Sequence, residues 1–133
     1  MLTYIRDYGI TFVSFFLIDL VWLAFIARKL YQSNIGHLMA ANVNWVAAIL
    51  FYLLFIAGLL FFVIHPALAE NSLRNAFIIG AFFGLITYAT YDLTNLATLK
   101  DWPVFITVVD LIWGSTLSGL TAGLSYWVIQ KFN

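Results

Sequence analysis

Three aspartates lie inside long apolar stretches of this 133-residue sequence, where an acid is unexpected. They are Asp19, Asp92 and Asp110, and the other three acidic residues stand near the ends of such stretches. If the stretches cross a membrane, each mid-helix carboxylate costs roughly 2.5–3.5 kcal/mol on insertion scales. Because acids inside a membrane usually serve protons, ions or ligands, these three are the candidate functional groups.

The composition places the chain in a bilayer. Hydrophobic residues make up 64% of the sequence and charged residues 9%, with a mean hydropathy of +0.98. A soluble domain of this length could not bury so much apolar surface, whereas a membrane requires only that backbone polar groups bond within helices. The absence of cysteine excludes disulfides, a thiol nucleophile and thiolate metal sites.

Four apolar stretches have the roughly 20 residues that a membrane span needs. We expect spans over Tyr8–Ala27, Trp45–Ile64, Asn75–Leu99 and Pro103–Gln130. The first stretch is too long for a signal peptide and is predicted to be a retained span. The predicted fold is all-α: one polytopic domain, residues 1–133, with four transmembrane helices in a bundle.

The segment between the first two spans predicts a short helix lying in the membrane interface. Its sequence is RKLYQSNIGHLMAANVN, and its larger apolar residues fall on one side of such a helix. These residues are Leu30, Tyr31, Ile35, Leu38 and Met39. The two later connections are short and contain no further domain.

The orientation of the chain in the membrane does not follow from its basic residues. Four spans place both termini on one face, and each face then carries three basic residues. Arg6, Arg74 and Lys131 lie on the face of the termini, and Arg28, Lys29 and Lys100 on the other. Dual insertion with antiparallel dimers therefore stays open as an alternative.

The three aspartates are predicted to share one layer of the membrane. Each lies eight or nine residues from the nearest charged residue at the end of its span. At about 1.5 Å per residue this is roughly 12–14 Å below a helix end, and alternating topology puts all three ends on one face. We therefore expect the carboxyl groups of Asp19, Asp92 and Asp110 to lie within about 10 Å of one another, at a depth set by helical rise.

Helical periodicity predicts how the spans face each other. The third span has one polar arc, comprising Gly80, Gly84, Thr87, Tyr88, Tyr91, Asp92, Asn95 and Thr98. The fourth has another, comprising Thr107, Asp110, Gly114, Ser118, Thr121 and Ser125, and we expect the two arcs to pack together. Asp19 instead shares its side of the first span with aromatic residues, and the second span is expected to be a scaffold.

Two further patterns concern symmetry and assembly. The tetrapeptide DLVW at Asp19 returns as DLIW at Asp110, which would fit an inverted repeat. Gly119-x-x-x-Gly123 lies away from Asp110 and predicts a close-contact face for a homodimer. His65 is interpreted as an interfacial residue.

Three carboxylates in one layer, without a lysine or arginine inside a span, cannot all stay charged and unpaired. The site must hold protons or a cation. The leading hypothesis is proton- or cation-coupled transport or binding of a small cationic or polar solute, with aromatic rings as cation–π surfaces. The candidate ligand- or proton-binding residues are Asp19, Asp92, Asp110, Asn95, Tyr88, Tyr91, Trp22 and Trp113.

Two alternatives remain for these carboxylates. In the first they are a general acid and base, or ligands of a divalent metal, in an enzyme that acts on a lipid or isoprenoid. In the second they are structural and only bond neighbouring hydroxyl and amide groups. Apart from a possible divalent metal, no cofactor is identified. The expected partners are the bilayer, the small molecule or cation and another copy of the chain, with no nucleic acid.

The segment YDLTNLATLKDWP, with the flanking DLVWL and DLIWG sequences and the overall length, resembles a family of small bacterial predicted membrane proteins of unknown function. The resemblance covers essentially the whole chain, and Tyr91–Pro103 is its most specific part. It implies a four-helix, multi-pass protein of the bacterial inner membrane. It implies no catalytic residue and no substrate.

Overall fold

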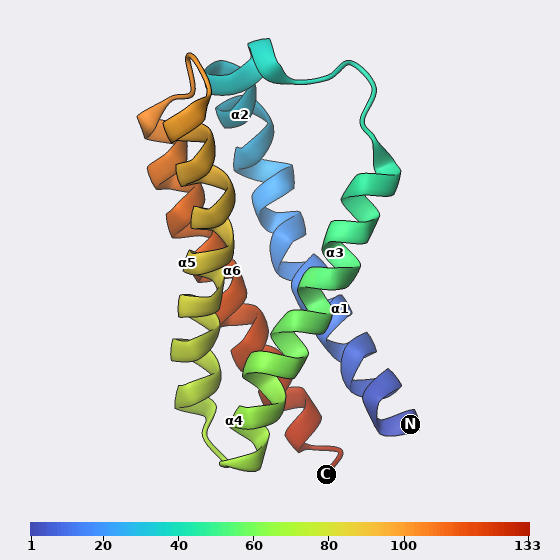
Figure 1. Cartoon of the computed structure of the whole chain (residues 1–133). Coiled ribbons are helices and arrows are strands. Elements are labelled where there is room, and N and C mark those ends of the chain that lie inside the picture. The colour runs from blue at the N-terminus through green and yellow to red at the C-terminus, as the bar shows by residue number, and fades with distance from the viewer.

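The computed structural model describes all 133 residues, and every regular element in it is a helix (Figure 1). The first helical stretch comprises α1 (Leu2–Trp22), a π-helical turn η1 (Leu23–Ala27), α2 (Arg28–Ile35) and a 3₁₀ turn η2 (Gly36–Leu38). The second comprises α3 (Trp45–Leu59), a π-helical turn η3 (Leu60–Ile64) and α4 (His65–Ala69). The last two are α5 (Leu73–Thr98) and α6 (Val104–Gln130).

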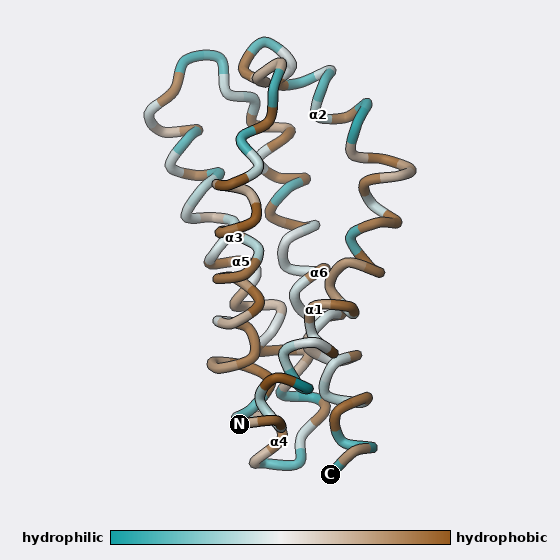
Figure 2. Tube along the Cα trace, turned by 90° about the vertical axis from the view of Figure 1, so that its right-hand side faces the viewer, coloured by the Kyte–Doolittle hydropathy of each residue, from teal (hydrophilic) through white to brown (hydrophobic).

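These stretches confirm the four predicted spans. They run over Leu2–Leu38, Trp45–Ala69, Leu73–Thr98 and Val104–Gln130, and each is long and apolar enough to cross a membrane. Both termini lie at the same end of the bundle, as an even number of spans requires (Figure 1). Hydrophilic segments gather at the turns at the two ends, and the trace between them is mostly hydrophobic (Figure 2).

The segment predicted to form a separate interfacial helix is helical, as α2 and η2, but it is a continuation of the first span. It follows α1 without a break, through the π-helical turn η1 (Figure 1). A π turn holds more residues than an α turn, so it rotates the side chains of α2 relative to those of α1. Tyr31 on α2 thereby reaches the interior of the bundle and the aspartate layer.

Local sequence explains where the later helices begin. The side chain of Asn44 accepts a hydrogen bond from the Ala47 amide at 3.2 Å, which caps α3. Ser72 caps α5 in the same way, accepting from the Asn75 amide at 3.0 Å. Between α5 and α6 the chain turns at Asp101, whose φ of 60° is in the left-handed region that aspartate tolerates better than most residues.

The closest helix pair is α5 with α6, and glycines allow the approach. A Cβ at Gly80 would lie 2.7 Å from the Ala122 Cβ, and a Cβ at Gly84 would overlap the Gly114 carbonyl and the Ser118 side chain. The Ser115 hydroxyl also donates to the Ala81 carbonyl across the pair at 2.9 Å. The polar arc of the third span therefore packs on that of the fourth, as predicted.

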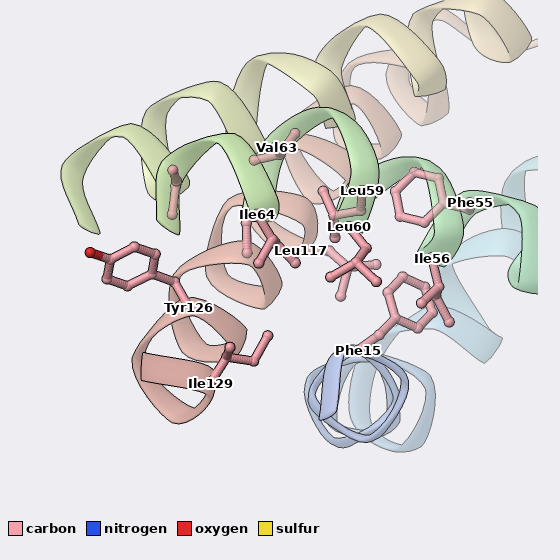
Figure 3. Packing of buried hydrophobic residues seen from close by; sticks show 13 residues of the cluster. Phe15, Phe55, Ile56, Leu59, Leu60, Val63, Ile64, Leu117, Tyr126 and Ile129 are labelled. Carbon is pink, nitrogen blue, oxygen red and sulfur yellow. The ribbon is translucent and has the colours of Figure 1, made fainter. Parts of the chain in front are cut away.

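The main hydrophobic core lies towards the end of the bundle that holds the termini. Side chains of α1, α3, η3 and α6 interlock there (Figure 3). The labelled members of this cluster are Phe15, Phe55, Ile56, Leu59, Leu60, Val63, Ile64, Leu117, Tyr126 and Ile129. This core holds the second half of the second span, from Phe55 onward, against α1 and α6.

The first half of α3 is packed far less closely. Its apolar side chains are exposed on several sides, including Val46, Ile49, Leu50 and Leu54. In Figure 1 this part of α3 leans away from α5 and α6. In a bilayer these side chains would face lipid, and the bundle is open at this level.

The prediction that Gly119 and Gly123 form a homodimer contact is wrong. Gly119 and Gly123 are buried inside the chain, where Phe77 and Ala81 of α5 cover them. The Gly119-x-x-x-Gly123 pattern marks a close helix contact, but its partner is α5 and not a second copy. Homodimer formation by another face stays a prediction.

The contact at Gly84 yields a stability prediction. Replacing Gly84 with Ala should lower the free energy of unfolding by about 1–3 kcal/mol, because the new methyl group meets backbone and cannot be accommodated without a shift. Gly9→Ala is the matched control. Nothing lies within 4 Å of a Cβ at Gly9, so helix propensity should leave stability unchanged or raise it by up to about 1 kcal/mol.

Thermal unfolding of both variants in the same mild detergent checks this prediction. A melting temperature for Gly84→Ala equal to that of Gly9→Ala would show that the α5–α6 contact is not close-packed.

Candidate functional site

All three aspartates point into the protein. Asp19 on α1 is 5% exposed, Asp92 on α5 is 1% exposed, and Asp110 on α6 is 8% exposed. None of them faces the lipid, although a bundle of only four helices has a small interior. The helices that carry them are the ones predicted to form the site.

Asp110 receives a hydrogen bond that the sequence analysis missed. The Tyr31 hydroxyl donates to its Oδ1 at 2.5 Å. The sequence pattern ends the first span at Ala27 and predicts Tyr31 on the apolar side of a separate interfacial helix, whereas the helix continues through η1 into α2. A π turn changes the angle of α2, and no feature of the sequence LAFIA reveals it.

Asp92 and Asp110 are neighbours across the α5–α6 contact. Their carboxyl groups are close enough to act on each other directly. Neither oxygen of Asp92 has a hydrogen-bond partner with good geometry in the protein. Two adjacent buried carboxylates cannot both carry a charge without compensation. The pair must therefore share a proton or bind a cation.

Tyr88 lies at the centre of the acidic layer. Its hydroxyl is within electrostatic range of Asp19, Asp92 and Asp110. Its ring rests on Gly114, where any Cβ would overlap it. The glycine of α6 thus makes room for the tyrosine ring of α5.

A stacked pair of indoles lies beside Asp19. The indoles of Trp22 and Trp113 stack with ring centroids 4.5 Å apart and an angle of 10° between their planes. Trp113 also lies next to the Asp19 carboxyl, and Trp22 lies next to the Tyr31 hydroxyl, although neither pair is aligned as a full hydrogen bond. The ring beside the first acid therefore comes from α6.

Tyr91 and Asn95 lie at the edge of the site. The Tyr91 ring meets Trp102 edge to face, with centroids 5.7 Å apart. Trp102 is held in turn by a hydrogen bond of 3.0 Å from its Nε1 to Thr107 Oγ1. Asn95, one turn further along α5, is the polar neighbour of the Tyr91 hydroxyl.

A cavity of about 380 Å³ opens beside the carboxyl pair. Phe51, Tyr88, Tyr91 and Asp110 line it. Phe51 on α3 is 48% exposed and Tyr91 on α5 is 56% exposed, so the cavity is open at the surface beside these two residues. The second span, expected only as a scaffold, supplies one wall of this cavity through Phe51.

No three histidine, aspartate or glutamate side chains gather closely enough to hold a metal ion together. The arrangement that the structure does show is a carboxyl pair, Asp92 and Asp110, with a tyrosine donor on one side and an aromatic cavity on the other. Such a site can exchange a proton for a cation or polarise a polar group of a ligand.

The Tyr31 bond can be tested by its effect on stability. Tyr31→Phe should lower the free energy of unfolding by about 1–3 kcal/mol, because the buried Oδ1 of Asp110 loses the hydroxyl that donates to it. Tyr4→Phe is the control, since the Tyr4 side chain is exposed and makes no hydrogen bond through its hydroxyl. Melting curves in one detergent compare the two. Equal melting of both variants would mean that Tyr31 does not hold Asp110.

Comparison with known proteins agrees with the membrane fold. No curated protein matches the chain, and no solved structure matches it. A family model described as "Predicted membrane protein (DUF2177)" matches residues 4–127. Because the match spans nearly the whole sequence and confirms the resemblance drawn from its motifs, the chain belongs to this family of predicted membrane proteins of unknown function.

Proposed function

We propose that the chain binds a small cationic or polar solute at the Asp92–Asp110 pair and releases a proton as it does so, as in a proton-coupled transporter. The observation that carries this proposal is Asp92 itself. Its carboxyl group is 1% exposed and unpartnered, and it lies beside a second acid. A group in this position is costly unless it has a proton or cation to hold.

The protein offers no fixed positive charge to this pair. Arg28, Lys29 and Lys100 are at the same end of the bundle, but all three are exposed. The Asp110 partner is a tyrosine hydroxyl, which donates a hydrogen bond without carrying a charge. The balancing charge is therefore exchangeable, which is what coupled binding requires.

The cavity suits an organic cation. A volume of about 380 Å³ is within the roughly 300–1,000 Å³ typical of small-molecule sites. Three of its four lining side chains are aromatic, and a cation over such a ring gains about 0.5–2 kcal/mol. The acid supplies the charge contact and the rings supply the rest.

Replacing Asp92 with Asn should affect the stability of the protein and its binding of ligands in different ways. Asp92→Asn should melt no lower than wild type near neutral pH, because it removes a buried group that is costly to charge. It should also lose stabilisation by cationic ligands. In wild type that stabilisation should rise with pH, since fewer protons then compete for the carboxyl pair, and in the variant this dependence should vanish.

Melting curves from acidic to alkaline pH, with and without the best hit from a screen of organic amines and quaternary ammonium compounds, measure both effects. Asp101→Asn is the matched control, because Asp101 is exposed and asparagine also tolerates its positive φ. An Asp92→Asn protein that binds the hit with unchanged pH dependence would reduce Asp92 to a structural role.

A second candidate function rests on the direction in which the cavity opens. Its exposed lining residues, Phe51 and Tyr91, lie within predicted spans, so in a bilayer a lipid or isoprenoid would have access to it from the hydrocarbon layer. A carboxyl pair that shares a proton provides a general acid and a general base side by side. We therefore keep a membrane enzyme acting on such a substrate as the alternative.

Incubation in vesicles separates the two functions. Wild-type protein in vesicles of total membrane lipid with added isoprenoid alcohols and phosphates is followed by mass spectrometry. An enzyme should form a product that neither Asp92→Asn nor Asp110→Asn forms, whereas a transporter should leave the lipids unchanged and take up the cationic hit.

A further inference from the structure

Few interactions hold helix α2 to the rest of the protein. None of its residues is buried, and the segment that follows it, residues 36–44, is exposed throughout. The side chains of Ser33 and Asn34 donate hydrogen bonds only to carbonyl groups within the helix. The bond of 2.5 Å from the Tyr31 hydroxyl to Asp110 Oδ1 is the one side-chain hydrogen bond that joins α2 to another helix.

The turn between α1 and α2 is suited to bending. It is the π-helical turn η1, and π-helical turns interrupt the regular hydrogen-bond ladder, where helices bend most readily. Only Ala27 of η1 is buried, whereas the other π-helical turn, η3, contributes Leu60, Val63 and Ile64 to the hydrophobic core. A bend at η3 would therefore disrupt the core, while a bend at η1 would move α2 and leave the core intact.

Tyr31 occupies an oxygen of the acid that a ligand in the cavity would reach first. Asp110 lines the cavity, and Asp92 is the less exposed member of the carboxyl pair. Hydrogen bonds between a charged donor and a carboxylate are roughly twice as strong as those from a neutral hydroxyl. An ammonium group could therefore replace the Tyr31 hydroxyl on Asp110, whereas an uncharged donor of the same shape would gain nothing by doing so.

The place of α2 in the bundle determines what its movement would open. It lies at the end away from the termini (Figure 1). Asp92 and Asp110 each lie about 9 Å along their helices from that end. Movement of α2 away from α6 would thus give the acids an opening at the end of the bundle, in addition to the one beside Phe51 and Tyr91.

We propose that α2 is a lid on the Asp92–Asp110 site, hinged at η1, and that Tyr31 is the latch that a bound organic ammonium ion releases. The proposal rests on the proposed function, because the ligand competes with Tyr31 for Asp110. It adds the step by which a solute would reach the water at one end of the bundle. Alternating access requires such a second opening to a single site.

Distances between spin labels test the lid without any ligand. The chain has no cysteine, so Ser33→Cys on α2 and Thr98→Cys at the end of α5 provide the only two labelled positions, and both are exposed. In nanodiscs, Tyr31→Phe should lengthen and broaden the distance between the labels, as measured by pulsed electron paramagnetic resonance. Asn34→Ala is the matched control and should leave the distance unchanged, because it removes a bond within α2 only.

Two probes of similar shape test the latch. Benzylammonium carries a charge and benzyl alcohol does not. Benzylammonium should move the labels of wild type to the distances found in Tyr31→Phe, whereas benzyl alcohol should leave them in place.

Binding affinity distinguishes a latch from a fixed support. A closed lid lowers the apparent affinity by the fraction of protein that is open, so Tyr31→Phe should bind benzylammonium about tenfold more tightly than wild type in calorimetry. If Tyr31 only supported Asp110 or contacted the ligand, its loss would weaken binding. Asn34→Ala should bind like wild type.

Unchanged label distances in a folded Tyr31→Phe protein, or weaker binding by that variant, would overturn the proposal. If the variant does not fold, labelled wild type gives the answer, since benzylammonium that binds without changing the distance overturns the lid and leaves the proposed function standing. Failure of the proposed function shows instead in the Asp92→Asn experiment. Longer distances in Tyr31→Phe without ligand would still support the lid in that case.

Discussion

The close approach of α5 and α6 is the constraint on which the site depends. Glycines at positions 80, 84 and 114 remove the side chains that would hold the two backbones apart. In a membrane, where lipid is as apolar as leucine, such contacts are held by van der Waals packing and interhelical hydrogen bonds. The same approach brings Asp92 beside Asp110, so the packing that stabilises the pair also creates its most costly feature.

The bundle divides into two unlike halves. The half near the termini is filled by the aromatic and aliphatic cluster around Ile56, Leu59 and Leu117 (Figure 3). The other half holds the three aspartates, and there α3 leans away and leaves a cavity beside Phe51. Close packing would leave no room for a ligand, and an open bundle without a core would not hold the acids in place. One half thus supports the other.

The buried acids differ in the partners of their carboxyl groups. Asp7 is also buried, yet Arg6 and His65 contact both of its oxygens, as expected of a structural ion pair with a second group able to take a proton. Asp92 has no such partner, although its cost of burial is as great. The difference between a satisfied and an unsatisfied carboxyl group, and not the mere presence of an acid, distinguishes the two ends.

The amino-acid sequence by itself determined the membrane class, the four spans and the choice of Asp19, Asp92 and Asp110. These follow from local properties: the length of an apolar stretch, the cost of a charge within it and the angle between residues on one helix. The pairing of the glycine-containing arcs of α5 and α6 was predictable for the same reason.

Only the tertiary structure decided which helices meet at each face. It packed Gly119 and Gly123 of α6 against α5 and brought Tyr31 to Asp110. It also placed Phe51 in the wall of the cavity. It also paired Asp7 with His65, which are 58 residues apart. Contacts between distant segments depend on crossing angles and helix phase, which shape complementarity sets over the whole bundle and which no single helix encodes.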